Sequence, residues 1–323
     1  MLIRSSLSGF VALAATALVG CPEPGPDPGP DPEPVVLPGP DEIDLDGLCP
    51  LEDRYGAFLV EAYDSYTILQ GQIADGVVPV TILEEVYSEG GCALLKRNNP
   101  FCDPACEPGF TCDFDGECIV FAEPQDLGTV TVDGLVERLE IEPVNPGWNY
   151  FSTTLPHPAM TAGETIRITT GDGRWAPFEL WGVGVEPLEI PPETTWIIDG
   201  GEPVTVTWTP PSGPTWAEVS FRLNIDQHGN SPVTLHCAFE DTGEAEVPAA
   251  AVDALLDSGV SGWPNATLSR RTADSADVGE GCAELLVSSL QAGTVELADY
   301  IPCNAQTPCP DGMTCDLAIE LCQ

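Results

Sequence analysis

Residues 217–225 read AEVSFRLNI, and in this stretch apolar side chains alternate with polar ones. Successive side chains of a β-strand point to opposite faces of a sheet, so the pattern predicts a strand with one buried face. Turn-forming stretches rich in glycine, proline and aspartate bound it and its neighbours. Further short strands are predicted at residues 57–63, 66–72, 129–132, 164–169, 203–208 and 233–239. Together they predict an all-β protein, an antiparallel β-sandwich.

One segment of this β-rich body predicts a helix. Residues 248–257 read PAAAVDALLD, with proline first, alanine and leucine inside, and Gly259 just past the end. Proline is favoured at the first position of a helix and glycine just after its last. We therefore expect one short helix near residues 248–257.

Twelve of the 13 cysteines lie beyond Cys21 and form two sets of six that match in order. The string C-x-x-G-x-T-C-D occurs at residues 106–113 and again at 309–316, and G-C-A occurs at 91–93 and 281–283. In each set a wide gap precedes a cluster of four cysteines. This internal repeat predicts two equivalent units. The sets are Cys49, Cys92, Cys102, Cys106, Cys112 and Cys118, and Cys237, Cys282, Cys303, Cys309, Cys315 and Cys322.

An even number of cysteines in an exported chain indicates disulfides. Zinc is the alternative, but only Cys102 and Cys106 approach zinc-ligand spacing, and their counterparts do not. Cysteine positions alone leave the connectivity open. We expect each wide pair to join strands and each cluster to pair first to third and second to fourth. The expected bonds are Cys49–Cys92, Cys237–Cys282, Cys102–Cys112, Cys106–Cys118, Cys303–Cys315 and Cys309–Cys322.

The first 21 residues have the features of an export signal. Arg4 precedes an apolar run over residues 10–19, which is too short to cross a bilayer. The run ends in Leu-Val-Gly-Cys at residues 18–21, which resembles the bacterial lipobox. The resemblance implies that residues 1–20 are removed, that Cys21 carries acyl chains, and that Pro22 directs the protein to the outer membrane. An ordinary secretory signal with a chance cysteine is the alternative.

Residues 22–40 read PEPGPDPGPDPEPVVLPGP. Proline-rich segments favour an extended polyproline II chain of about 3.1 Å per residue, and the repelling acids keep it extended. We expect residues 21–46 to form a stalk that starts at the lipidated Cys21. A proline-rich recognition ligand is the alternative, but no basic residue flanks the prolines.

The chain beyond the stalk divides by its cysteine content. We expect an N-terminal β module at 47–98, a Cys-rich knob at 99–121, a β-sandwich domain at 122–298 and a second knob at 299–323. The knobs resemble EGF-like modules over about 20 residues each. The chain has 52 acidic and 10 basic side chains, which excludes nucleic acid as a partner because phosphates need basic groups. Such an acidic excess also keeps an exported protein soluble.

No pattern in the chain predicts catalysis, so we expect no enzyme, no cofactor and no metal. Neither G-x-S-x-G nor H-E-x-x-H occurs, and His157, His228 and His236 are the only imidazoles. Asp226 and His228 are expected to shape a turn rather than share a site. Residues 113–117 begin like a calcium loop but lack the glutamate spacing of an EF-hand, so a turn is expected there too.

Three aromatic residues are candidates for ligand contact. Trp148, Tyr150 and Trp175 lie in turn-like contexts, where exposed rings serve sugar-binding sandwiches as stacking surfaces. Trp208 occupies an alternating strand position and is expected in the core. These residues carry the hypothesis of a carbohydrate-binding module.

Residues 237–249 resemble a recurrent ending of β-sandwich modules in uncharacterised bacterial surface lipoproteins. Taken with the lipobox, stalk and knobs, the resemblance covers most of the chain, and it implies a cell-surface location without implying an activity. We expect a non-catalytic, lipid-anchored outer-membrane or cell-surface protein for binding, adhesion or envelope structure, with a glycan or protein ligand. A carbohydrate-binding module, and an extracellular hydrolase or protease inhibitor, are the alternatives.

Overall fold

The computed structural model describes residues 35–192, 194–225 and 232–323. The predictions for the signal segment, for Cys21 and for Asp226 and His228 lie outside the described residues. Residues 37–323 form one compact unit. The all-β prediction is confirmed, and the one α-helix among the described residues, α1 (Ala249–Asp257), lies where the sequence places it. Within the described residues no helix is both long and apolar enough to cross a membrane.

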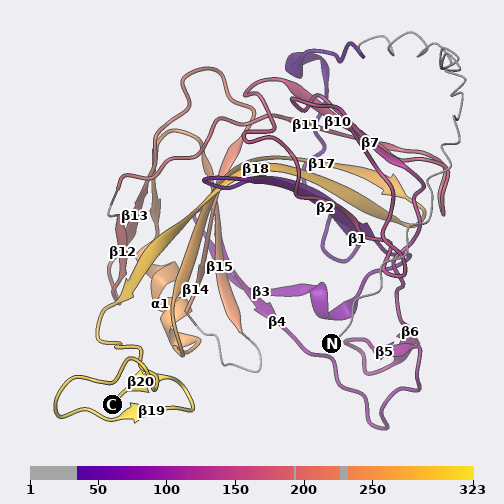
Figure 1. The fold of residues 1–323 in the computed structure, drawn as a ribbon. Helices are drawn as coiled ribbons and strands as arrows, with labels where there is room; N and C mark the ends of the chain where they lie inside the picture. Colours follow the sequence, from indigo (N-terminus) through magenta and orange to yellow (C-terminus); the bar gives the residue numbers. More distant parts are fainter. Residues whose placement is uncertain (1–34, 193, 226–231) are drawn as a thin grey trace, which may run out of the picture. The chain divides into compact units, whose positions relative to one another are not determined.

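A long sheet of ten strands runs through this unit (Figure 1). Most neighbours in it are antiparallel, but β1 and β12 both pair with β18 in parallel, which corrects the expectation of a purely antiparallel sandwich. The order along the sheet is β3 (Leu83–Glu89), β4 (Cys92–Arg97), β15 (Val233–Glu240), β14 (Glu218–Asn224), β17 (Asn265–Val278), β18 (Gly281–Leu297), β1 (Arg54–Ala62), β2 (Thr67–Ile73) and β9 (Tyr150–Ser152), with β12 (Thr195–Ile198) beside the end of β18.

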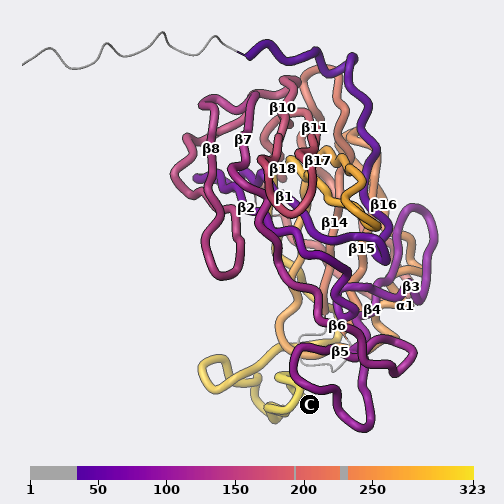
Figure 2. The backbone as a smooth tube through the Cα atoms, turned by 90° about the vertical axis from the view of Figure 1, so that its right-hand side faces the viewer, coloured from indigo at the N-terminus to yellow at the C-terminus, as the bar shows by residue number. Residues whose placement is uncertain are grey.

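The strands of the expected N-terminal module do not form a module of their own. β1 pairs with β18, and β4 pairs with β15, so both hairpins from residues 47–98 are built into a sheet made mainly by the C-terminal strands. Figure 2 shows β1 next to β18, although more than half the chain separates them in sequence. The predicted boundary between residues 98 and 122 therefore does not divide the sheet.

Two hydrophobic cores lie against the long sheet. The first core gathers side chains such as Trp196, Phe221 and Leu255, beneath β13 (Val204–Thr207), β16 (Glu244–Val247) and α1. The second core gathers Phe58, Leu285 and Ile168, beneath β7 (Val130–Asp133), β8 (Leu139–Ile141), β10 (Thr165–Thr169) and β11 (Glu179–Val183). In Figure 1 the long sheet bends, and these smaller sheets lie on the outside of the bend.

The other face of the long sheet faces neither core. Phe221 and Leu223 belong to the first core, so Arg222 between them points the opposite way. Likewise Phe58 and Val60 belong to the second core, and Leu59 between them points away from it. We call this surface the open face and define it by Leu59, Glu61, Arg222, His236, Arg271 and Leu286, which alternate with core residues on β1, β14, β15, β17 and β18.

The two long strands β17 and β18 were not predicted from the sequence, because polar residues occupy their buried positions. Arg270, Thr272 and Asp274 alternate along β17 and are each 3% exposed or less. A strand whose inward positions carry a charge, a hydroxyl and a carboxyl does not show the usual alternation of apolar and polar residues. Each group instead finds a partner on a covering segment, for example Thr272 Oγ1, which donates to Val183 O at 3.0 Å.

The wide disulfides correct the sequence prediction. Cys49 bonds to Cys282 and Cys92 bonds to Cys237, so the expected Cys49–Cys92 and Cys237–Cys282 pairs are wrong. The physical reason is the register of the sheet, since Cys92 lies directly opposite Cys237 on the β4–β15 ladder. Each wide bond thus joins a cysteine of one repeat to a cysteine of the other.

The knobs have the four disulfides that the sequence predicts: Cys102–Cys112, Cys106–Cys118, Cys303–Cys315 and Cys309–Cys322. Each knob contains one small hairpin, β5 (Phe110–Cys112) with β6 (Cys118–Val120), and β19 (Cys315–Asp316) with β20 (Leu321–Cys322). The shared glycines, Gly109 and Gly312, both have φ of 91°, a conformation that favours glycine. The repeated string is therefore explained by a common backbone.

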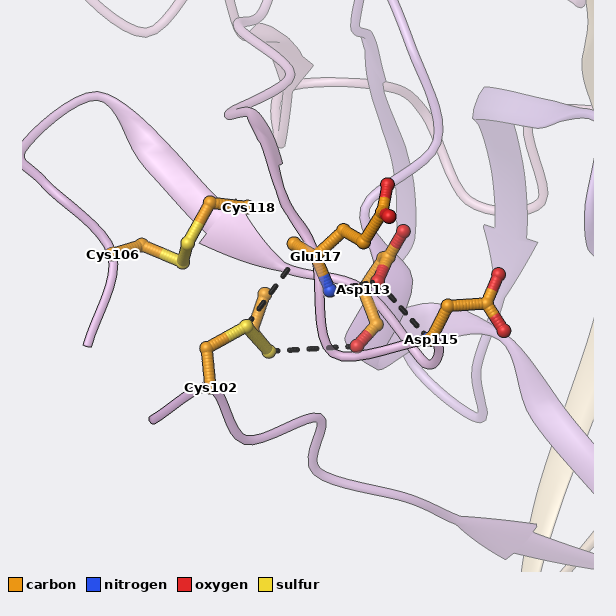
Figure 3. The surroundings of a disulfide bond; sticks show 7 residues. Cys102, Cys106, Asp113, Asp115, Glu117 and Cys118 are labelled. Atoms are coloured by element: carbon orange, nitrogen blue, oxygen red, sulfur yellow. Dashed lines mark hydrogen bonds between the residues drawn. A yellow bond between two sulfur atoms is a disulfide. The ribbon is translucent and has the colours of Figure 1, made fainter. Parts of the chain in front are cut away.

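The shared aspartate of the string caps a turn in both knobs. Asp113 Oδ1 accepts the backbone N–H groups of Asp115 and Glu117 at 3.0 and 2.8 Å (Figure 3). Asp316 Oδ1 accepts the N–H of Ala318 at 2.9 Å. Residues 113–117 are thus a turn whose first carboxylate is already engaged by backbone donors.

A strap of residues 37–53, including the 3₁₀ turn Pro40–Glu42, crosses the body before β1 begins. Thr165 Oγ1 donates to Pro38 O at 2.8 Å, the Asp46 N–H donates to Asp274 at 3.0 Å, and the Cys49 N–H donates to Glu284 at 2.8 Å. The expected stalk therefore ends earlier than residue 46, because its last residues are hydrogen-bonded to the sheet.

Candidate binding face

The open face is the surface of the long sheet on which side chains are half-buried without belonging to a core. Leu59 and Leu286 lie opposite each other on β1 and β18, and both are partly exposed. Polar groups flank them, with Glu61 opposite Ser288, and Ser288 opposite Arg271 on β17. A face that mixes partly exposed leucines with a few polar groups has the usual make-up of a binding surface.

A groove of about 430 Å³ lies at the β1–β2–β9 end of this face. Phe151 is 52% exposed and forms one wall. Amide side chains line the groove beside it, and Gln72 Nε2 donates to Asn149 Oδ1 at 2.9 Å and to Gly147 O at 2.7 Å. The lining residues are Ala57, Leu59, Gln70, Gly71, Gln72, Val144, Asn149, Tyr150 and Phe151.

Glu61 lies between the groove and the middle of the open face. Burial raises the pKa of its carboxyl, and a hydrogen bond from Tyr63 Oη at 3.2 Å opposes the rise. Burial is also the main reason that the pKa of Tyr63 rises to about 12, and the neighbouring Glu61 adds to it. The half-buried Glu61 carboxylate thus accepts hydrogen bonds from Tyr63 and from Gln70 Nε2, the latter at 3.4 Å, and these donors hold it in place.

The opposite end of the open face carries basic groups. Arg222 on β14 lies directly across from His236 on β15, and Arg271 lies on the neighbouring strand β17. Arg271 forms an ion pair with Glu218, with N–O distances of 2.7 and 2.9 Å. A second groove of about 610 Å³ lies between the strap, at Leu45 and Leu48, and strands β14, β15 and β17. Arg271 and Glu218 are among the residues that line it.

The predicted aromatic contacts do not form one surface. Tyr150 is fully buried in the second core, where its hydroxyl donates to Gly128 O at 3.0 Å and accepts the Leu127 N–H at 2.8 Å, and burial raises its pKa to about 12. Trp175 is half-buried against Tyr55, with ring centroids 6.4 Å apart, near the β17–β18 turn. Trp148 is half-buried before β9. The exposed Phe151 was missed, although it follows Tyr150 and must point to the other face.

The most elaborate polar cluster of the body is structural. Arg270 is 1% exposed, and its guanidinium donates to both oxygens of Asp241, which also accepts the indole N–H of Trp208 at 2.7 Å. Carbonyl oxygens of Glu186, Pro187 and Thr209 accept its remaining hydrogens. Every donor is satisfied and buried, so this cluster holds segments together and presents no group to a ligand.

Among the described residues, two cysteine groupings and one histidine–threonine pair have spacings that could suggest a metal site or a nucleophile. The two cysteine groupings with ligand-like proximity, Cys102, Cys106 and Cys118 and their counterparts in the second knob, are all consumed by disulfides. His157 Nδ1 lies 3.1 Å from Thr67 Oγ1, but that hydroxyl is on a residue only 1% exposed. Among the described residues this hydroxyl is therefore not placed to attack a substrate.

No protein-family model matches the chain, and a search of curated proteins finds no match to it.

Proposed function

We propose that the protein is a non-catalytic, lipid-anchored binding protein of the cell surface, and that its ligand binds on the open face. The observation that carries the proposal is the combination of half-buried leucines, engaged polar groups and a 430 Å³ groove on a face that neither core covers. Two long-range disulfides cross-link this part of the molecule, one joining β4 to β15 and the other joining the strap to β18. A surface held rigid before binding loses less entropy when a ligand docks.

The anchor is supported by the lipobox-like Leu-Val-Gly-Cys at residues 18–21 and the proline-rich segment after it. An acyl chain contributes about 0.8 kcal/mol per buried CH₂, so two or more chains hold a protein stably on a membrane. The full-length chain, expressed in a bacterial host fed an alkyne fatty acid, should incorporate the label. Cys21→Ala should abolish labelling and release the protein from the membrane fraction; labelling that persists in this variant would contradict the anchor.

Binding on the open face predicts that the chain beginning at residue 22 adheres saturably to isolated bacterial envelopes. Leu59→Lys places a charge in the centre of the face and should weaken this binding at least tenfold. Leu317→Lys, at a 67% exposed position in the second knob, is the matched control and should leave it unchanged. Equal loss in both variants, or hydrolysis of ester, glycoside or peptide substrates that Glu61→Gln abolishes, would overturn the proposal.

A carbohydrate ligand is the second candidate, and the Phe151 groove is the observation that favours it. An exposed ring beside the amides of Gln70, Gln72 and Asn149 offers a stacking surface and hydrogen-bonding groups for sugar hydroxyls. The candidate sugar-binding surface is therefore this groove and not Trp148 or Trp175. On a glycan array, Phe151→Ala should remove the signal and Phe114→Ala, in the first knob, should keep it. Wild-type chain that binds no glycan would end this candidate.

A further inference from the structure

The basic end of the open face stands out in a chain of net charge −42. Arg222, His236 and Arg271 lie on three adjacent strands, β14, β15 and β17, and all face away from the first core. Because like-charged groups repel, neighbouring basic side chains are usually separated or paired with acids. Here only one of the three has an acidic partner.

Arg271 is neutralised and Arg222 is not. The Arg271 guanidinium is held by Glu218 through two contacts of 2.7 and 2.9 Å. Within the described part of the chain the Arg222 guanidinium makes no hydrogen bond and no ion pair, although 52 acidic side chains are available to the protein. A guanidinium has five N–H donors in a planar fork that fits two oxygens of one anion.

His236 supplies a second unused group directly beside it. Its Nε2 is buried and has no hydrogen-bond partner among the residues that the structure describes. A buried polar atom without a partner costs about 1–3 kcal/mol, so each one in a native structure calls for an explanation, of which a bound ion is one. Arg222 and His236 are directly opposite on the β14–β15 ladder, where side chains of a pair are close enough to act on one group.

We propose that Arg222 and His236 form a receptor for one oxyanion, the carboxylate, phosphate or sulfate group of the ligand that the open face binds. The fork of Arg222 donates to two oxygens of the anion, and the imidazole Nε2–H donates to one of them. Arg271 adds positive potential from the next strand while Glu218 holds it in place. This inference rests on the proposed function and narrows its ligand to one that carries an acidic group.

The titration of His236 reports on this site. Burial, together with the nearby charges of Arg222 and Arg271, lowers its pKa to about 4. The other charged groups that share the face of His236 on β14, β15 and β4 are Glu218, Glu240 and Arg97. A bound anion favours the imidazolium, so it raises the pKa of His236 from this low value.

The test is side-chain NMR of the whole chain from residue 22, which contains only three histidines. Acetate, phosphate and sulfate are titrated separately at constant ionic strength, with sodium chloride as the reference salt. We expect at least one anion to shift the His236 signals saturably and to raise the pKa of His236, while the His157 signals stay unchanged. The anion with the lowest Kd identifies the source of the acidic group.

Arg222→Gln separates the proposal from a general charge effect. It should weaken anion binding at least tenfold, whereas Arg174→Gln, which removes an equal charge from an exposed loop, should change it less than twofold. No saturable shift of His236 with any of the three anions, or equal loss in the two variants, would overturn the site. Envelope binding that survives Arg222→Gln but not Leu59→Lys would refute the oxyanion receptor and leave the proposed function standing.

Discussion

The knobs and the body use disulfides in opposite ways. In the knobs each bond joins cysteines 10 to 13 residues apart, whereas in the body the bonds span 145 and 233 residues. The knob pairs follow from spacing because a segment so short has few ways to fold. The body pairs follow from the sheet, which places β4 against β15 and the strap against β18. Sequence repeats thus identify equivalent cysteines, but the partner depends on which strands become neighbours.

The largest expected effect comes from removing the wide bonds. A loop-entropy estimate gives about 5 kcal/mol for closing loops of 145 or 233 residues and about 3 kcal/mol for a loop of 13. The double variants Cys92→Ala with Cys237→Ala, and Cys49→Ala with Cys282→Ala, should therefore lower the free energy of unfolding in denaturant more than Cys309→Ala with Cys322→Ala. If the knob variant lowers the free energy of unfolding of the body as much as a variant without a wide disulfide does, the proposed difference between the two kinds of bond is wrong.

The buried Arg270–Asp241 cluster is a second interaction that joins segments of the body distant in sequence, and it does not involve the knobs. Removing one partner of a buried ion pair costs about 3–5 kcal/mol, because the other charge stays buried without compensation. Asp241→Ala leaves the Arg270 guanidinium and the Trp208 indole unpaired, and should lower the unfolding midpoint strongly. The control is Glu140→Ala, which removes an exposed ion pair with Arg138 worth about 0–1 kcal/mol. Similar losses in the two variants would contradict a structural role for the cluster.

The strap should make the stability of the body depend on pH. Burial raises the pKa of Asp274 and Glu284 above their ordinary values of 3.8 and 4.5, although each accepts a strap N–H. When the pKa of an acid is higher in the folded than in the unfolded state, protonation favours the folded state. This contribution to the free energy of unfolding is fully present at pH values below the unfolded-state pKa, and it is lost as the pH rises through the folded-state pKa. Wild type should therefore lose stability, relative to Asp274→Asn with Glu284→Gln, as pH increases from about 4.

Urea unfolding at a series of pH values measures this difference. The control, Asp103→Asn with Glu107→Gln in the first knob, neutralises two exposed carboxylates and so matches the change in net charge. A wild type that instead gains stability over the double variant with rising pH would show that the strap favours the charged carboxylates.

The smallest effect compares the two knobs with each other. Gly109→Ala and Gly312→Ala force alanine into a left-handed backbone, which costs roughly 1–2 kcal/mol for a residue with a Cβ. Amide exchange in each knob hairpin should accelerate by a similar factor, while Gly213→Ala, at an open position without positive φ, should not alter it. Acceleration in one knob alone would show that the repeated string does not impose one backbone.

The all-β class, the helix and several of the strands could be predicted from local pattern. Residues 217–225 became β14 and residues 248–257 became α1, because alternation and helix-end signals are local properties. β17 was missed because Arg270 and Asp274 occupy its inward positions. The N-terminal hairpins were assigned to a separate module because pairing between β1 and β18 has no local signal.

The candidate site was less readable. Tyr150 was expected at the surface and lies in the core, since a turn-like context does not say which way a ring points. Phe151 next to it, and Arg222 opposite His236, become visible only when the register assigns each strand residue to a face. Residue identity suggested aromatic contacts, and the register of the sheet determines which residues share a surface.

Disulfide mapping of the oxidised protein tests the central claim most directly. The claim is that the wide disulfides join cysteines of the first repeat to cysteines of the second, so that both repeats contribute to one sheet and one open face. Proteolysis without reduction, followed by mass spectrometry, should yield linked peptides containing Cys92 with Cys237 and Cys49 with Cys282. Peptides that join Cys49 to Cys92 and Cys237 to Cys282 would contradict the crossed arrangement and, with it, the single sheet on which the binding face depends.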